Sequence, residues 1–188
     1  MAKPRSPRGQ GRERVLEAAL DLFAVHGISG TSLQMIAERL GVTKAAVYFQ
    51  FHAKDDIVVA VLQPAMDELA DIVRRAQAEP TPDAQLDAAL AGLIAFVVQQ
   101  RQLVAVIRGD PSVNRVLREQ SGFQEVTDEL GAILLGPEPD PYRRVAASTL
   151  GAGLSLATAD PVLADLDDET LRTELLRCAQ ALLPHSHR

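Results

Sequence analysis

The sequence predicts an all-α protein of about nine helices, with three short helices near its start and a larger helical domain after them. Apolar residues recur at helical spacing along most of the 188 residues, and no stretch alternates apolar and polar residues as a half-buried strand does. Ala, Leu, Arg and Glu, which favour helices, are abundant, whereas aromatic residues make up 4% of the chain and Trp is absent. We therefore expect no sheet.

The composition also excludes several classes of protein. Hydrophobic residues form 47% of the chain and charged residues 23%, so a packed core is expected rather than disorder. The longest uncharged apolar run, 88–98, is shorter than the roughly 20 residues of a membrane span, and acidic residues interrupt the early apolar stretch 15–25 that a signal peptide would need. The single cysteine, Cys178, excludes an internal disulfide framework and is expected to behave as a small buried hydrophobe. We expect a cytoplasmic protein.

Charge is distributed unevenly along the chain. Residues 1–54 contain eight Lys and Arg against four acidic residues, a formal charge of +4, whereas residues 55–188 carry −10. This division indicates a small basic module that contacts a polyanion, joined to an acidic body that does not. The alternative is a chance fluctuation to which a basic tail contributes.

The first part of the chain predicts an arm and one helix. Residues 1–11 mix Pro, Gly and Arg without an apolar period, which is typical of a disordered basic arm. This arm either enters a minor groove, as arms of other DNA-binding domains do, or is a solvated tail. From Arg12 onward apolar residues mark one helical face, and Gly27 offers a helix stop.

Two further short helices follow, and together the three form a helix-turn-helix pattern. Thr31 and Gln34 have capping-box spacing for a helix that ends at Gly41, and Thr43 is placed to cap the next helix, which ends near Phe51. In a helix-turn-helix unit the second helix of the pair lies in the major groove of DNA. Residues 12–54 are therefore predicted to be a DNA-binding domain.

The third helix is expected to present a reading surface. Val47 and Phe51 are four residues apart and face inward. The outward side chains are those of Lys44, Ala45, Tyr48 and Phe49. The small Ala45 permits close approach to the groove, and its methyl group is suited to contact with a thymine methyl. Lys54 begins the next helix, where free backbone N–H groups favour a phosphate.

The remaining helices form a second predicted domain, 55–188. The apolar pattern places them at about 55–78, 86–97, 123–135, 142–159 and 168–183. The first of these contains Pro64, so we expect either a bent long helix or two helices that meet near Gln63. The helix at 86–97 is apolar on almost every side and is therefore expected to be central.

Five short motifs between His26 and Lys54 point to a known family. They are, in order, Gly-x-x-x-Thr-Ser, Ile-Ala, Gly-Val-Thr, Tyr-x-x-Phe and Lys. In this order and spacing they resemble the N-terminal signature of tetracycline-repressor (TetR) type regulators, over about residues 12–62. The sequence departs from the family pattern at Phe49, where a second Tyr is common, and at Gln50, where His is frequent.

The resemblance implies roles for individual residues. It assigns phosphate contacts to Tyr48 and Lys54, a hydroxyl contact to Thr31, and base reading to the helix that carries Lys44, Ala45 and Phe49. The predicted DNA-binding residues are Thr31, Thr43, Lys44, Ala45, Tyr48, Phe49 and Lys54.

The resemblance also implies a helical C-terminal domain that dimerises and binds a small-molecule effector. The small-residue face of 142–159, beside the apolar face of 168–183, suits a four-helix bundle between two subunits; the alternative is that both faces pack within one subunit. The predicted effector-binding residues are Met66, Phe96, Gln100, Arg108 and Phe123. Their alternative roles are core packing and, for Arg108, contact with a helix end.

These observations favour one function and leave an alternative. The leading hypothesis is a repressor that binds a palindromic operator as a homodimer and is released by a small-molecule effector of unknown identity. The alternative is a DNA-binding structural or interaction protein whose C-terminal domain binds a protein and no small molecule. A nucleophile elbow, a P-loop and a metal-spaced Glu/His cluster are all absent from the sequence, so we expect no enzyme, cofactor or metal.

Overall fold

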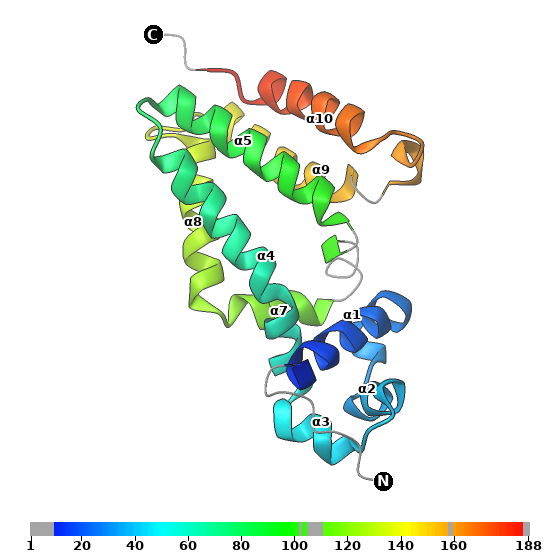
Figure 1. Ribbon diagram of the computed structural model, residues 1–188. Helices are drawn as coiled ribbons and strands as arrows, with labels where there is room; N and C mark the ends of the chain where they lie inside the picture. Colours follow the sequence, from blue (N-terminus) through cyan, green and yellow to red (C-terminus); the bar gives the residue numbers. More distant parts are fainter. Residues whose placement is uncertain (1–9, 102, 105–110, 158–159, 186–188) are drawn as a thin grey trace. The chain divides into compact units, whose positions relative to one another are not determined.

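The computed structural model describes residues 10–101, 103–104, 111–157 and 160–185. Over these ranges the chain forms helices and contains no strand, so the predicted all-α class is confirmed (Figure 1). The chain divides into two compact units, one of Met1–Pro64 with Val106–Glu119 and the other of Ala65–Ala105 with Gln120–Arg188. The division at residue 54 that the sequence suggests stays a prediction.

The first unit holds the helix-turn-helix. It contains α1 (Gln10–Gly30), α2 (Leu33–Leu40), α3 (Lys44–Gln50), the start of α4 (Lys54–Gln77), and α7 (Pro111–Arg118). The helix α1 contacts α2, α3 and α7, and α2 contacts α3. The core of this unit buries Val15, Ala19, Phe23, Ile36, Val47, Phe51, Ile57 and Val113.

Glycines shape the two turns of the helix-turn-helix. Gly27 has a φ of 70° inside α1, and Gly41 closes α2 in the left-handed conformation at φ 64°. Both values lie where glycine is favoured over other residues, and both glycines are the stops predicted from the sequence. The helix α1 is nevertheless prolonged beyond its kink at Gly27 to Gly30, so the helical segment is longer than expected.

The caps of the two short helices differ in outcome. The prediction that Thr31 caps α2 is wrong: Ser32 is the N-cap, and its hydroxyl oxygen accepts from the backbone N–H of Met35 at 3.2 Å. Thr and Ser are both suitable N-cap residues, so the cap type is as predicted and its position is one residue later. The prediction for α3 is confirmed, because Thr43 Oγ1 accepts from the backbone N–H of Ala46 at 3.2 Å.

The helix α4 continues through Pro64, which is also the last residue of the first unit before Val106. One continuous helix is therefore observed in place of two helices that meet near Gln63, and the predicted bend at Pro64 stays a prediction. The first turn carries Asp55 and Asp56, which interact favourably with the positive end of the helix dipole.

The second unit is a helical bundle around α5 (Pro82–Gln99). With the end of α4 it contains α8 (Ser121–Leu135), α9 (Pro141–Ala157), the short 3-10 helix η1 (Pro161–Leu163) and α10 (Asp168–Leu182). The helix α5 contacts α8, α9 and α10, and α10 runs along it in Figure 1, so the predicted central position of α5 is confirmed. Its core residues include Leu86, Leu90, Ile94 and Val97.

The cysteine and the lengths of the helices bear on two expectations drawn from composition. Cys178 on α10 is exposed in the single chain, so the expectation of a buried thiol is wrong. Among the described helices, none is long and apolar enough to cross a membrane.

Candidate nucleic-acid interface

The helix α3 has one buried face and one exposed face. Val47 is fully buried and Phe51 is 4% exposed, as the spacing predicts. On the opposite face Lys44 and Ala45 are exposed, Tyr48 is 53% exposed and Phe49 is 83% exposed. The inner face fixes the helix to the unit, so the outer face is available to a partner.

The exposed face of α3 bears a shallow depression that is wide open to solvent. Five side chains line its volume of about 560 Å³, those of Lys44, Ala45, Tyr48, Phe49 and His52. The rings of Tyr48 and His52 pack edge to face, with their centroids 5.4 Å apart. The exposed rings of Tyr48 and Phe49 therefore belong to one open, largely apolar hollow, which we call the α3 hollow.

The two predicted threonines are held by backbone groups. Thr43 is the α3 cap, and its hydroxyl hydrogen is not used by that bond. Thr31 is 2% exposed, and its hydroxyl donates to the carbonyl oxygen of Gly27 at 2.8 Å. Within the protein, Thr31 thus fastens the junction between α1 and α2; the contact of either threonine with DNA stays a prediction.

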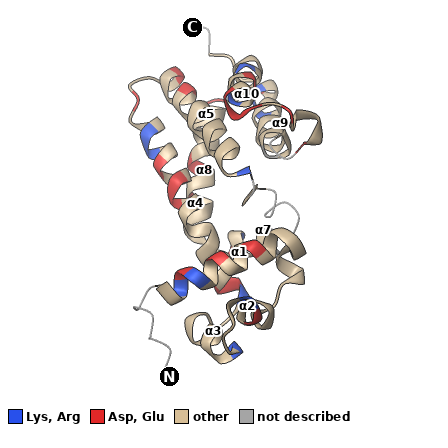
Figure 2. Cartoon of the chain, turned by 45° about the vertical axis from the view of Figure 1, so that its right-hand side comes forward, with Lys and Arg blue, Asp and Glu red and all other residues tan. Residues whose placement is uncertain are grey.

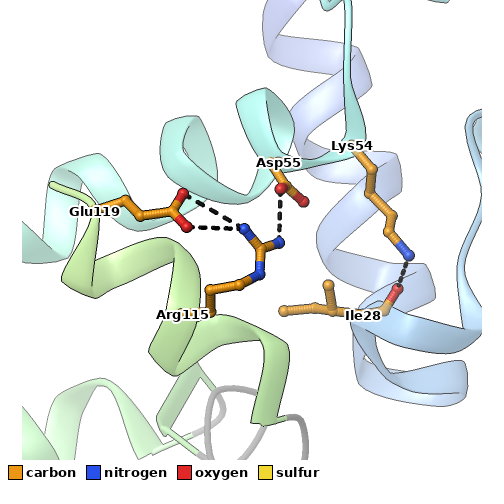
Figure 3. A network of polar contacts seen from close by, with 5 residues as sticks. All are labelled: Ile28, Lys54, Asp55, Arg115 and Glu119. Carbon is orange, nitrogen blue, oxygen red and sulfur yellow. Dashed lines mark hydrogen bonds and ion pairs between the residues drawn. The ribbon is translucent and has the colours of Figure 1, made fainter.

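Lys54 has the clearest internal role of the predicted residues (Figure 3). Its Nζ donates to the carbonyl oxygen of Ile28 at 2.7 Å, the contact that Figure 3 draws. It also donates to the carbonyl oxygens of Thr31 at 3.1 Å and Ser29 at 3.4 Å. An ammonium has three donors, and the end of a helix presents unpaired carbonyls with partial negative charge. Lys54 therefore joins the start of α4 to the end of α1. Its contact with a phosphate stays a prediction.

The helix α7 contributes a second polar link to α4 in this unit (Figure 3). Arg115 donates from Nη2 to Asp55 Oδ2 at 2.8 Å and from Nη1 to Glu119 Oε1 at 3.1 Å. These two hydrogen bonds, that of Asp55 first, raise the pKa of the Arg115 guanidinium. No local pattern in the sequence predicts this contact, because Arg115 and Asp55 are 60 positions apart.

Basic side chains of the first unit differ in what they contact within the protein. Blue segments mark the start of α1 and lie on α2 and α3 in Figure 2. Arg39 of α2 pairs with Asp21 of α1 at 2.9 Å, which offsets its charge. The Arg12 guanidinium lies 5.0 Å from the centre of the Phe51 ring, a cation–π distance. Arg12 lies within α1, which begins at Gln10, slightly earlier than the apolar pattern predicts.

The predicted effector residues do not line one pocket together. A half-open pocket of about 430 Å³ in the second unit, called the cavity below, is lined by Glu68, Ile72, Arg75, Ala88, Gly92, Ala95, Phe96 and Gln99. Of the predicted set only Phe96 lines it. Gln100 follows α5 and its side-chain amide donates to Glu68 Oε2 at 3.1 Å, so it holds one lining residue. Met66 and Phe123 are half-buried, and Arg108 lies outside the described residues.

The helix α9 exposes an apolar stripe. Tyr142, Val145 and Leu156 are each more than half exposed, and they lie on one face with exposed Thr149 and Ala152. The other face of α9 buries Ala146, Leu150 and Leu154 in the core of the second unit.

In the part of the chain that the structure describes, no group of three His, Cys, Asp or Glu side chains is arranged to hold a metal.

Comparison with known proteins agrees with this geometry. Residues 15–61 match the family described as bacterial regulatory proteins, tetR family. The chain is similar to the HTH-type transcriptional regulator SrpR of Pseudomonas putida, at 43% identity over 51 residues, which cover 27% of this chain and 24% of SrpR. It is also similar to the probable acrEF/envCD operon repressor of Escherichia coli K12, at 32% identity over 127 residues, which cover 62% and 58% of the two chains.

The fold has solved counterparts. The crystal structure of NalD, the secondary repressor of the MexAB-OprM multidrug efflux pump in Pseudomonas aeruginosa, matches with a TM-score of 0.70 and 23% identity, over 95% of this chain and 98% of that one. The alignments with the two curated relatives span less than two thirds of their length. The match to the family model covers the helix-turn-helix, and the likeness of the whole chain to the solved structure is one of fold.

Proposed function

We propose that this chain, whose residues 15–61 match the tetR family of bacterial regulatory proteins, is a cytoplasmic repressor of that family that binds a palindromic operator as a homodimer. A small-molecule effector bound by the second unit releases it from DNA. The observation that carries the proposal is the division of α3 into a buried face, with Val47 and Phe51, and an exposed face suited to the major groove.

The exposed stripe of α9 supports the homodimer. A helix that buries one face in its own core and exposes Tyr142, Val145 and Leu156 on another presents apolar surface to a partner. A second copy of the same chain supplies the same stripe, as a twofold interface requires. Two copies also supply two α3 helices for the two halves of a palindrome.

The cavity in the second unit supports an effector. It joins apolar side chains, among them Ile72 and Phe96, to the polar groups of Glu68, Arg75 and Gln99. Ligand sites in proteins typically combine an apolar lining with a few polar groups, and the volume of about 430 Å³ lies within their usual range of roughly 300–1,000 Å³. We expect an amphipathic small molecule.

The test begins with selection of duplexes from a random pool by the full chain, followed by titration of the selected sequence. We expect an inverted repeat bound by two copies, with affinity that falls as salt rises. A panel of amphipathic molecules is then screened for a shift in thermal unfolding and in operator affinity. Selection without sequence preference contradicts the DNA-binding proposal. An operator whose affinity no small molecule changes favours instead a C-terminal domain that binds a protein.

A further inference from the structure

The α3 hollow carries an inference about which bases the protein reads. Its lining consists of the methyl group of Ala45, the rings of Tyr48, Phe49 and His52, and the side chain of Lys44 at the start of the helix. Phe49 is 83% exposed, the highest exposure among the exposed large hydrophobic side chains of the described residues. A ring placed so openly gains little from the protein's own core, because most of its surface stays in contact with solvent.

The side chains of the α3 hollow determine which group of a base they are able to recognise. Phe49 and Ala45 have no side-chain donor or acceptor, so they are unable to read the hydrogen-bonding edges of bases. In the major groove, the apolar group that distinguishes one base from the others is the C5-methyl group of thymine. The hollow lies in a segment, 1–54, of charge +4, and Lys44 lies beside it to approach the DNA backbone or a guanine.

We infer that Ala45 and Phe49 form a receptor for thymine methyl groups, so that the operator half-site carries thymine opposite the α3 hollow. This inference rests on the proposed function, because it names the base that the same surface reads. Ala45 lies one turn before Phe49, at the start of the helix. The two side chains therefore contact neighbouring positions of the half-site, and the Phe49 ring covers the methyl that Ala45 does not reach.

The experiment uses the full chain and its selected operator. Each dT of one half-site, and then of both, is replaced by dU, which keeps base pairing and removes only the C5-methyl group. We expect one or two positions at which dU weakens binding about fourfold per half-site, the value of one buried methyl group, and no effect at the others. In Phe49→Ala the penalty at one of these positions disappears, whereas Phe49→Leu, which keeps an apolar side chain, retains part of it.

A matched control and two outcomes separate this inference from the function on which it rests. Gln50→Ala changes the neighbouring exposed residue of α3, which does not line the hollow, and should keep the full dT-to-dU penalty. Equal affinity for dT and dU at every position of a selected operator overturns the inference and leaves DNA binding intact. A penalty that Phe49→Ala leaves unchanged at every position also overturns the role of Phe49. Circular dichroism checks that each variant keeps its helices.

Discussion

The ammonium of Lys54 lies 2.7 Å from the carbonyl oxygen of Ile28, so the first side chain of α4 closes the end of α1. The same nitrogen also reaches the carbonyl of Thr31, the residue before the α2 cap. Lys54 thus holds the turn that leads into the helix-turn-helix. A residue in this position affects DNA binding through the geometry of the unit, whether or not it contacts a phosphate.

Replacement of Lys54 by Met tests this positional role. The change removes the ammonium that donates to three carbonyl oxygens, of which that of Ile28 keeps a hydrogen bond from the backbone N–H of Thr31, so we expect the free energy of unfolding to fall by about 1–3 kcal/mol. Operator affinity should fall while the dependence of log K on log salt keeps its slope. Lys44→Met, at an exposed position of α3, is the matched control. It should make the salt dependence of binding weaker, with a slope smaller in magnitude by about 0.9, and it should change stability little. Urea unfolding and titrations at several salt concentrations measure both quantities.

The result for Lys54→Met distinguishes two roles. If the salt slope falls by about 0.9 and stability stays at the parent value, Lys54 is a phosphate contact of the kind that the family resemblance implies. If stability falls and the slope is kept, Lys54 is a positioning residue.

The cap of α3 offers a second prediction, because capping and DNA contact respond differently to charge. Thr43→Ala removes the acceptor for the Ala46 N–H and should cost about 1 kcal/mol of stability. Thr43→Asn and Thr43→Asp both keep an acceptor and should be as stable as the parent protein. Only Asp adds a negative charge at the helix start, which should weaken operator binding about fivefold per half-site by repulsion of a phosphate about 4 Å away.

Unfolding curves and operator titrations of the three Thr43 variants check this prediction. Equal operator affinity for the Asn and Asp variants would place Thr43 away from the DNA backbone. Loss of stability in Thr43→Asn would mean that the cap contributes through the threonine methyl group rather than through its oxygen.

The third prediction concerns pH and the end of the chain. His185 Nε2 lies 3.0 Å from Asp87 Oδ1 of α5, and this hydrogen bond, together with the charge of Asp87, raises the pKa of His185 above its ordinary value of 6.5. The protonated ring is therefore favoured in the folded state. Its contribution to stability is complete below pH 6.5 and is lost as the pH rises through the raised pKa.

Nuclear magnetic resonance titration of the His185 ring gives the measurement. We expect a pKa above 6.5 in the parent protein and a lower value in Asp87→Asn, which removes the charged partner. The difference in unfolding free energy between parent and Asp87→Asn should be larger at about pH 5 than at about pH 8. A difference that grows with rising pH would contradict the assignment.

Much of this architecture follows from local sequence patterns. Apolar periodicity located the helices, and it also separated Val47 and Phe51 from the exposed residues of α3, because one turn of a helix fixes which side chains share a face. Patterns of this range carry no information on tertiary partners. The three carbonyl contacts of Lys54 and the pairing of Arg115 with Asp55 join residues 23–26 and 60 positions apart, and the sequence gives no sign of either.

The candidate effector site shows the same limit. Of the predicted effector residues that the structure describes, which are Met66, Phe96, Gln100 and Phe123, only Phe96 lines the cavity in the second unit. The other lining residues include Ala88, Gly92 and Ala95, whose small size leaves the space open. Small residues of this kind are not distinguished in sequence from ordinary helix formers, so a cavity between helices escapes prediction.

The last prediction concerns Gly92, which lines this cavity and closely faces α4. A Cβ atom at Gly92 would lie 2.6 Å from Cγ2 of Ile72, so this β-branched side chain, which is 4% exposed, would have to shift. Gly92→Ala should therefore destabilise the protein by about 1–3 kcal/mol through overpacking, although alanine favours helices. Gly131→Ala on α8 is the matched control: outside its own stretch of helix no atom lies within 4 Å of the added Cβ, so the helix should gain about 0.5–1 kcal/mol. Ile72→Ala removes the opposing methyl group and should make Gly92→Ala less costly than in the parent background, which a double-mutant cycle of urea unfolding measures. Stabilisation of the parent protein by Gly92→Ala would instead show that α4 and α5 separate easily at this point, and that the wall of the cavity is free to yield to an effector.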